Sequence, residues 1–169
     1  MTWYVLLIGA IAAERIAEVF VAQWNRAWSR QHRGVEFGGG HYPAMVALHA
    51  GLLAGCLVEP IALDRPFIPA LGWPMLTVVL TAQALRWWCI ATLGRQWNTR
   101  VIVIPGAPRV GGGPYRLVPH PNYVAVIAEG VALPLVHTAW ITAVAFSLLN
   151  GWLLRTRIAV ENEALVSLR

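Results

Sequence analysis

Long apolar segments, separated by short polar ones, dominate the pattern of this chain. A helix of roughly 20 apolar residues crosses the hydrocarbon core of a bilayer, and the segments approach this length. The last two are shorter and are joined through Pro134 and His137, which favours a tight helical hairpin. The five predicted helices are Trp3–Val21, Tyr42–Leu63, Ile68–Leu93, Asn122–Val136 and Thr138–Leu154. The expected fold is an all-α bundle of about five transmembrane helices.

Composition supports an integral membrane protein. Of the 169 residues, 57% are hydrophobic and 12% are charged, against roughly 25% charged in soluble domains. Five spans use most of this length, so we expect a single domain, 1–169. Within it, 1–95 would hold three spans, and 96–169 a polar loop, the helical hairpin and a C-terminal helix. Cys56 and Cys89 lie in separate apolar segments, which indicates neither a disulfide nor a metal site.

The distribution of arginines predicts the orientation. The net charge of +5 in so apolar a chain suits anionic headgroups rather than nucleic acid. Only Arg65 lies between the second and third segments, whereas the stretches after the first, third and fifth segments are rich in arginine. By the positive-inside rule, the N-terminus is outside and the C-terminus is cytoplasmic. The cytoplasmic arginines would be Arg26, Arg30, Arg33, Arg95, Arg100, Arg109, Arg116, Arg155, Arg157 and Arg169.

The polar stretch 98–123 is a candidate active site, because an apolar chain has few places for polar chemistry. Val101–Ile104 can lie extended, and the glycines and prolines after it let a ligand approach the backbone. Pro121 suits the first turn of a helix, where His120 and Tyr123 could both face a ligand. The alternative is an interfacial loop with belt aromatics. No strand followed by GxGxxG and a helix is present, so a Rossmann cofactor site is not expected.

The C-terminal segment holds a second polar cluster. Arg157 and Glu161 are four residues apart and share a helix face, where they could pair. The alternative is a solvated amphipathic tail whose arginines reach the headgroups. The predicted orientation places this cluster on the same side as the polar loop.

Three motifs resemble the isoprenylcysteine carboxyl methyltransferase family. They are Gly113-Pro114-Tyr115-Arg116, His120-Pro121-Asn122-Tyr123, and Arg157-Ile158 with Glu161 and Leu165. The resemblance covers the chain from Arg95 onward, and it implies an integral-membrane methyltransferase that uses S-adenosylmethionine. It implies catalytic roles for Arg157 and Glu161, and a cofactor site built by Val103, Gly113, Tyr115, Arg116, His120, Pro121 and Tyr123.

Further features are similar to a bacterial branch of alkylpyrone O-methyltransferases that accompany type III polyketide synthases. They are Arg86-Trp87-Trp88, Thr92-Leu93-Gly94, Trp97-Asn98-Thr99-Arg100 and the region from Glu36 to His41-Tyr42-Pro43. Two positions depart from the family pattern. Pro119 replaces an arginine, whose contacts Arg116 or Arg109 would have to supply, and Asn162 replaces the second of two paired glutamates, which Glu163 would have to replace.

The resemblance implies transfer of a methyl group to a lipophilic acceptor in the membrane. An alkylpyrone enol or a carboxylate is largely ionised near neutrality, so positioning rather than a strong base would supply the rate. Such an acceptor could enter sideways from the bilayer, because extracting a ten-carbon tail would cost about 8 kcal/mol at about 0.8 kcal/mol per methylene. A prenylated cysteine carboxylate is the alternative acceptor. The expected location is the bacterial cytoplasmic membrane, with the oligomeric state open.

Charges inside the predicted spans are costly in lipid. Glu18, Arg86 and Glu129 are therefore candidate substrate residues, as is His41 at a predicted cytoplasmic helix start. The alternative for the intramembrane charges, including Glu14 and Arg15, is an ion network that locks the bundle.

A different class of protein is also open: a non-catalytic membrane protein that holds haem or quinone. His49, His120 and His137 would be its ligands. No two of these histidines share a helix face at ligand spacing, and this hypothesis leaves the Gly-Pro loop unexplained.

Overall fold

The computed structural model describes residues 1–108 and 110–167. Arg109 and Arg169, both counted in the predicted orientation, lie outside this range, and so does the side chain of Leu165. The helices are α1 (Thr2–Gln31), α2 (Tyr42–Ala62), α3 (Pro69–Leu93), α4 (Pro121–Leu135) and α5 (Trp140–Ser167). Single 3-10 turns, η1 (Gly39–His41), η2 (Gly94–Gln96) and η3 (Gly113–Arg116), connect them.

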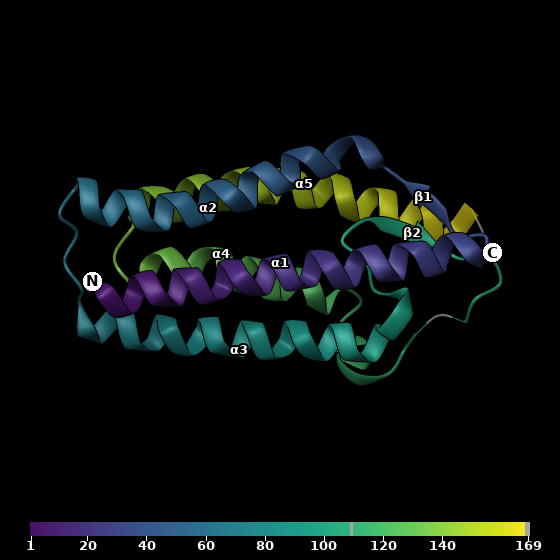
Figure 1. Ribbon diagram of the computed structural model, residues 1–169, viewed down its shortest axis with the longest axis horizontal. Coiled ribbons are helices and arrows are strands. Elements are labelled where there is room, and N and C mark those ends of the chain that lie inside the picture. The colour runs from purple at the N-terminus through teal and green to yellow at the C-terminus, as the bar shows by residue number, and fades with distance from the viewer. Residues whose placement is uncertain (109, 168–169) are drawn as a thin grey trace.

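The five helices run along the long axis of the molecule, with the N-terminus at one end and the C-terminus at the other (Figure 1). Helix α3 packs mainly against α4, and α5 packs against both α4 and α2. The main core lies between α1, α2, α3, α4 and α5 in the half nearer the N-terminus. Its fully buried side chains include Tyr4, Cys56, Val79, Leu133 and Val136. An all-helical bundle is therefore the main architecture, as predicted.

Helix α1 is longer than predicted, because it continues ten residues past Val21, where the predicted helix ended with its hydrophobic pattern. The predicted C-terminal helix is present as a continuation of the fifth apolar helix, since α5 runs past Leu154 to Ser167 without a break. A glycine or proline would favour an end to the helix, and neither follows Leu154. The continuation of α5 carries Arg157 and Glu161 on the same rigid element as the apolar segment.

A small sheet departs from the all-α prediction. Strands β1 (Val35–Phe37) and β2 (Val101–Val103) pair antiparallel, with Glu36 opposite Ile102. The β-branched stretch in β2 predicted extended backbone correctly, but its partner β1 was not predicted. The sheet packs against α5 at the end where the C-terminus lies (Figure 1).

The start of α5 is held by a carboxylate of α2. Glu59 accepts hydrogen bonds from the backbone N–H groups of Ile141 (3.1 Å) and Thr142 (2.7 Å) and from the Thr142 hydroxyl (2.8 Å). Arg65 pairs with the same carboxylate at 3.1 Å. A carboxylate satisfies the free N–H groups of a helix N-terminus well. Glu59 thereby fixes α5 to α2 at the end far from the sheet.

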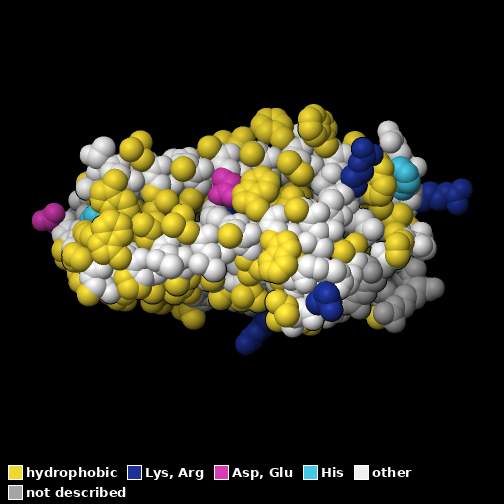
Figure 2. Space-filling model, turned by 90° about the horizontal axis from the view of Figure 1, so that it is seen from below, with side chains coloured by type: hydrophobic (Ala, Val, Ile, Leu, Met, Phe, Trp, Pro, Cys, Tyr) yellow, Lys and Arg dark blue, Asp and Glu magenta, His cyan; other side chains and the backbone are white. Residues whose placement is uncertain are grey.

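Hydrophobic side chains cover much of the surface. Figure 2 shows them over the middle and the end opposite the sheet, with basic side chains toward the sheet end. Within the described residues, the helical segments Gly39–Ala62 and Pro69–Gln96 are long and apolar enough to cross a membrane, and α4 is a shorter apolar helix. Exposed apolar residues such as Leu6 (69% exposed) and Trp152 (71%) extend this apolar surface onto α1 and α5.

Candidate functional site

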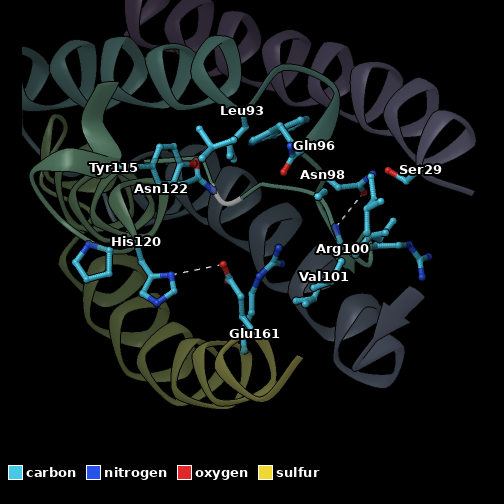
Figure 3. A pocket seen from close by; sticks show the side chains of 18 of the residues that line it. Ser29, Leu93, Gln96, Asn98, Arg100, Val101, Tyr115, His120, Asn122 and Glu161 are labelled. Atoms are coloured by element: carbon cyan, nitrogen blue, oxygen red, sulfur yellow. Dashed lines mark hydrogen bonds and ion pairs between the residues drawn. The ribbon is translucent and has the colours of Figure 1, made fainter. Parts of the chain in front are cut away.

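A cavity of about 610 Å³ lies at the sheet end of the bundle. Its walls come from the end of α3, strand β2 and the loop after it, the start of α4, and the C-terminal part of α5. In Figure 3, Tyr115, Asn122 and His120 face it from one side, Asn98, Arg100 and Val101 from the other, and Glu161 from α5. The polar loop and the C-terminal cluster therefore meet in space.

Four side chains form a connected row along one wall of the cavity. Arg157 Nε donates to the Tyr123 hydroxyl at 3.0 Å, and that hydroxyl donates to Glu161 Oε2. Glu161 Oε1 lies 3.6 Å from His120 Nδ1, and the His120 ring stacks on Tyr123. The predicted direct pairing of Arg157 with Glu161 is replaced by a link through Tyr123. A helix places residues three or four apart on one face, so α4 and α5 each supply neighbouring members of this row.

Arg157 is buried, with 7% of its surface exposed, yet hydrogen bonds within the described residues do not use all of its N–H groups. Its Nη1 donates to the Met45 sulfur at 2.7 Å. Within residues 1–108 and 110–167, no hydrogen bond is made by Nη2. A buried guanidinium with an unused N–H pair at a cavity wall can bind an anion through a charge-assisted hydrogen bond.

The opposite wall is braced by Glu36 of β1. Its carboxylate binds Arg100 at 2.5 Å and Arg26 at 2.8 Å, and Arg100 lies 4.0 Å above the Tyr42 ring. Burial acts to raise the pKa of Glu36, but hydrogen bonds and charge from the two arginines outweigh it and hold that pKa below its ordinary value. Glu36 therefore stays ionised and ties α1, the sheet and the start of α2 together.

Two polar atoms at the cavity are buried without partners. Asn122 Oδ1 and Trp97 Nε1 make no hydrogen bond within the described part of the chain, and both residues line the cavity. A buried polar atom left unpaired costs about 1–3 kcal/mol. One acceptor and one donor in residues that line the same cavity are therefore left without a partner among the described residues.

Six of the predicted functional residues line the cavity. They are Val103, Tyr115, His120, Tyr123, Arg157 and Glu161. Tyr115 is half-buried, and burial together with the neighbouring Cys89 raises the pKa of its hydroxyl, so it stays protonated. A neutral phenol of this kind can donate a hydrogen bond to a ligand.

Three predicted cofactor residues do not line the cavity. Gly113 has a φ of +53°, and a Cβ there would lie 2.5 Å from the Thr92 hydroxyl, so it is a packing and turn position. Pro121 is fully buried in the first turn of α4, and the Arg116 side chain is exposed. Arg116 is therefore not positioned to replace the arginine whose place Pro119 takes. Asn162 and Glu163 are also exposed, whereas Pro119 lines the cavity.

The candidate substrate residues inside the bundle form an ion network instead. Arg86 binds Glu129 at 2.8 Å and lies 3.6 Å from Glu18, which Arg15 binds at 3.0 Å. These four residues join α1, α3 and α4, and none of them lines the cavity. This arrangement matches the alternative in which the charges lock the bundle. His41 lies in η1, where it packs beside Gly38, and is likewise not part of the lining.

Sequence reasoning missed several lining residues. Polar ones are Ser29, Gln96, Asn98, Arg100 and Asn122, with the indole of Trp97 beside them. The lining residues in 96–100 could have been predicted, because they form a short polar segment directly after an apolar helix. Ser29 had no such pattern around it, because the predicted first helix ended eight residues before it.

The structure separates two of the histidines proposed for haem or quinone. His120 precedes α4 and His137 follows it, so they lie at opposite ends of this helix. They cannot both bind one haem iron.

An apolar groove lies between α2 and α5. Small residues and leucines of α2 form one wall, and leucines of α5 are part of the other. The α2 residues are Ala44, Ala47, Leu48, Gly51 and Leu52, and the leucines of α5 are Leu149 and Leu153. The helices close at Gly55, where a Cβ would lie 2.7 Å from Thr142. The groove therefore runs along the apolar part of α5, and Leu153 is one helical turn from Arg157.

Comparison with known proteins identifies the class. The model of the isoprenylcysteine carboxyl methyltransferase family matches residues 75–167, which include the cavity-forming loop, α4 and α5. The chain belongs to this family, whose members are membrane-embedded methyltransferases that use S-adenosylmethionine.

A curated relative extends the match over nearly the whole chain. It is the uncharacterized protein YpbQ of Bacillus subtilis strain 168, to which this chain is 36% identical over 166 residues, covering 98% of this chain and 96% of the relative. No solved structure matches.

Proposed function

We propose that this chain spans the membrane five times as one domain and methylates an oxygen of a lipid-tailed acceptor. The cavity, the basic loops and the C-terminus would be cytoplasmic, in keeping with the arginine distribution. The observation that carries the proposal is Arg157. Its buried guanidinium has an Nη2 that is unused within the described residues. Arg157 lines the polar cavity, one helical turn along α5 from Leu153 of the apolar groove.

The cavity fits S-adenosylmethionine. Its volume of about 610 Å³ is within the range of small-molecule sites, and Asn122 Oδ1 and Trp97 Nε1 offer an acceptor and a donor that lack protein partners. His120, Tyr115 and Tyr123 would enclose the cofactor, with Val103 at the strand wall. When bound, S-adenosylmethionine supplies an electrophilic methyl group on a sulfonium.

The protein contributes position and charge to the transfer. Arg157 would hold the acceptor oxygen as an anion through Nη2, while Tyr123 and Met45 fix the guanidinium. Glu161 orients Tyr123 and places negative charge on the cofactor side of Arg157. An in-line displacement depends chiefly on such alignment.

The apolar groove is the proposed place of the acceptor tail. A tail that lies along α5 from Leu149 to Leu153 would bring its polar head to Arg157 while the tail stays in contact with lipid. We favour an alkylpyrone-type acceptor over a prenylated cysteine. The features similar to alkylpyrone O-methyltransferases, such as Trp97-Asn98-Thr99-Arg100, support this choice.

The cofactor site is tested by titrating S-adenosylhomocysteine into detergent-purified protein. We expect saturable binding, and about 1–3 kcal/mol weaker binding when Asn122→Ala removes one polar partner. His120→Ala should also weaken binding, whereas Asp64→Asn, at the far end of the bundle, should not. Absence of binding by folded wild-type protein would refute the proposed function.

The acceptor is tested by competition. Equimolar 4-hydroxy-2-pyrone with a pentadecyl tail and N-acetyl-farnesylcysteine, offered with labelled S-adenosylmethionine, should give mainly methylated pyrone. In Ala47→Leu the groove is narrowed, so the KM for the pyrone should rise with little change in S-adenosylhomocysteine affinity. A preference for the farnesylated substrate would establish the alternative acceptor.

A further inference from the structure

Gln96 places an uncharged amide at the cavity. It is the last residue of η2, lines the cavity and is half-buried. In Figure 3 its side chain extends toward the cavity from the side opposite Glu161. Within residues 1–108 and 110–167, this side chain makes no hydrogen bond. Its carbonyl oxygen and its two N–H groups are therefore free to bind a ligand.

The backbone on both sides of Gln96 is held in place by a buried amide of α1. Asn25 Nδ2 donates to the Gly94 carbonyl at 3.2 Å and to the Trp97 carbonyl at 2.8 Å. Gln96 lies between these two anchored residues. A backbone that is fixed in advance lowers the conformational entropy lost when a side chain on it binds a ligand.

Asn98 provides a contrast on the same segment. It also lines the cavity, but its Nδ2 donates to the Ala22 carbonyl at 3.1 Å and its Oδ1 accepts from the Arg100 backbone N–H at 3.2 Å. The amide of Asn98 is thus used to hold the segment against α1. Gln96 has no such contact among the described residues, so its amide is the one available to a ligand.

The surroundings of Gln96 suit a flat base. Leu93, one helical turn earlier, and Tyr115 both line the cavity, and Figure 3 shows them on the same side as Gln96. An aromatic base needs apolar surface against its faces and a few polar groups at its edge. This part of the cavity offers both.

Charged side chains lie in other parts of the cavity wall. Arg157 and Glu161 come from α5, and Arg100 is paired with Glu36. The reacting sulfonium has to lie near the acceptor oxygen, which Arg157 is proposed to hold. The methionine part of the cofactor carries charges that need charged partners, whereas the adenine base is neutral. The uncharged wall at Gln96 therefore matches the base.

We propose that Gln96 determines the specificity of the cavity for adenine. Its Oε1 would accept from the 6-amino group of the base, and its Nε2 would donate to an adjacent ring nitrogen. A planar amide matches this pair of groups, and the same match lets Asn and Gln recognise adenine in DNA. This inference rests on the proposed methyltransferase function, because that function requires an adenine-containing cofactor.

The test titrates two ligands into detergent-purified wild type and Gln96→Met. The ligands are S-adenosylhomocysteine and its 6-deamino analogue, in which purine replaces adenine. Wild type should bind S-adenosylhomocysteine about 10-fold more tightly than the analogue, the value of one neutral hydrogen bond. Methionine keeps the length of the side chain without the amide. In Gln96→Met the two ligands should therefore bind within about twofold of each other.

Two further variants control the comparison. Gln96→Glu keeps an acceptor oxygen at the same distance, so it should retain the preference for the 6-amino group that Gln96→Met loses. Gln23→Met makes the same substitution on α1, where Gln23 is exposed and is not among the residues that line the cavity. It should match wild type with both ligands. Thermal unfolding without ligand reports that each variant is folded.

Two outcomes would overturn the inference while leaving the methyltransferase function intact. The first is equal binding of the two ligands by wild type. The second is a 10-fold preference that persists in Gln96→Met, even if both affinities fall, because Gln96 would then support the cavity without contacting the 6-amino group. Binding of neither ligand by folded wild type would instead refute the proposed function and this inference together.

Discussion

Arg157 is the residue on which the site depends most. Its planar guanidinium makes two fixed contacts, to Tyr123 and Met45, and still presents Nη2. A lysine keeps the charge but has a single nitrogen on a flexible stem. For Arg157→Lys we predict a fall in kcat of about 10²–10³-fold, comparable to loss of one transition-state donor. Measurement of kcat beside S-adenosylhomocysteine affinity checks this, since the affinity should change little.

Arg155→Lys provides the comparison on the same helix. Arg155 is exposed and is not among the residues that line the cavity. It should retain wild-type kcat, and an equal fall in both variants would show that the charge at Arg157 is not specifically used.

The lowered pKa of Glu36 predicts how the stability of the fold changes at acidic pH. Because its pKa is held below the ordinary value, its carboxylate stabilises the fold above the unfolded pKa of about 4.3, and this contribution is lost as pH falls through the lower folded pKa. Glu36→Gln should therefore melt below wild type at pH 7, and the two melting temperatures should approach each other only as pH falls below about 4.3. Thermal unfolding in detergent from pH 8 to 3.5 measures this. A gap that widens in acid would contradict it.

Helix contacts at single glycines set the spacing of the elements. At Gly130 of α4, a Cβ would lie 2.1 Å from the Phe146 ring of α5. Gly130→Ala should push these helices apart, cost about 1–3 kcal/mol by overpacking, and disturb the link between Tyr123 and Arg157. Gly151→Ala on α5 meets nothing within 4 Å, so it should gain about 0.5–1 kcal/mol of helix stability instead. Chemical unfolding of both variants, together with their kcat values, tests the contrast.

The elements show what the sequence could and could not predict. Apolar length was enough to place five helices, and the Gly-Pro loop with Arg157 and Glu161 was enough to find segments that meet at a cavity. The continuation of α1 to Gln31 was missed because amphipathic turns carry no strong hydrophobic signal, so Ser29 was missed as well. Strand β1 depends on a partner far away in the sequence, since Glu36 pairs with Ile102, 66 residues later. No local pattern shows that pairing, or the interposition of Tyr123 between Arg157 and Glu161.

The orientation of the whole molecule is open to a labelling experiment. The native Cys56 and Cys89 are buried, so they give little background with a water-soluble maleimide. Asp64→Cys lies in the loop that carries one arginine, and Gly111→Cys lies in the loop near the cavity. In intact cells we expect Asp64→Cys to be labelled at once and Gly111→Cys only after the membrane is permeabilised. The reverse pattern would place the cavity outside the cell.

Helix α5 also fixes the rotation and the distance between the residues that line the apolar groove and the residues that line the cavity. Leu149 and Leu153 border the groove, and Arg157 and Glu161 border the cavity. These four positions at intervals of four form one row on one helix, and the row winds around the helix by about 40° at each step. Inserting one residue after Leu153 would rotate the two halves by about 100° relative to each other while leaving composition almost unchanged. Only insertions or deletions close to whole turns keep the alignment. Insertions or deletions in α5 can therefore change the distance from the acceptor tail to the reacting oxygen only by whole helical turns, in steps of about 5.4 Å.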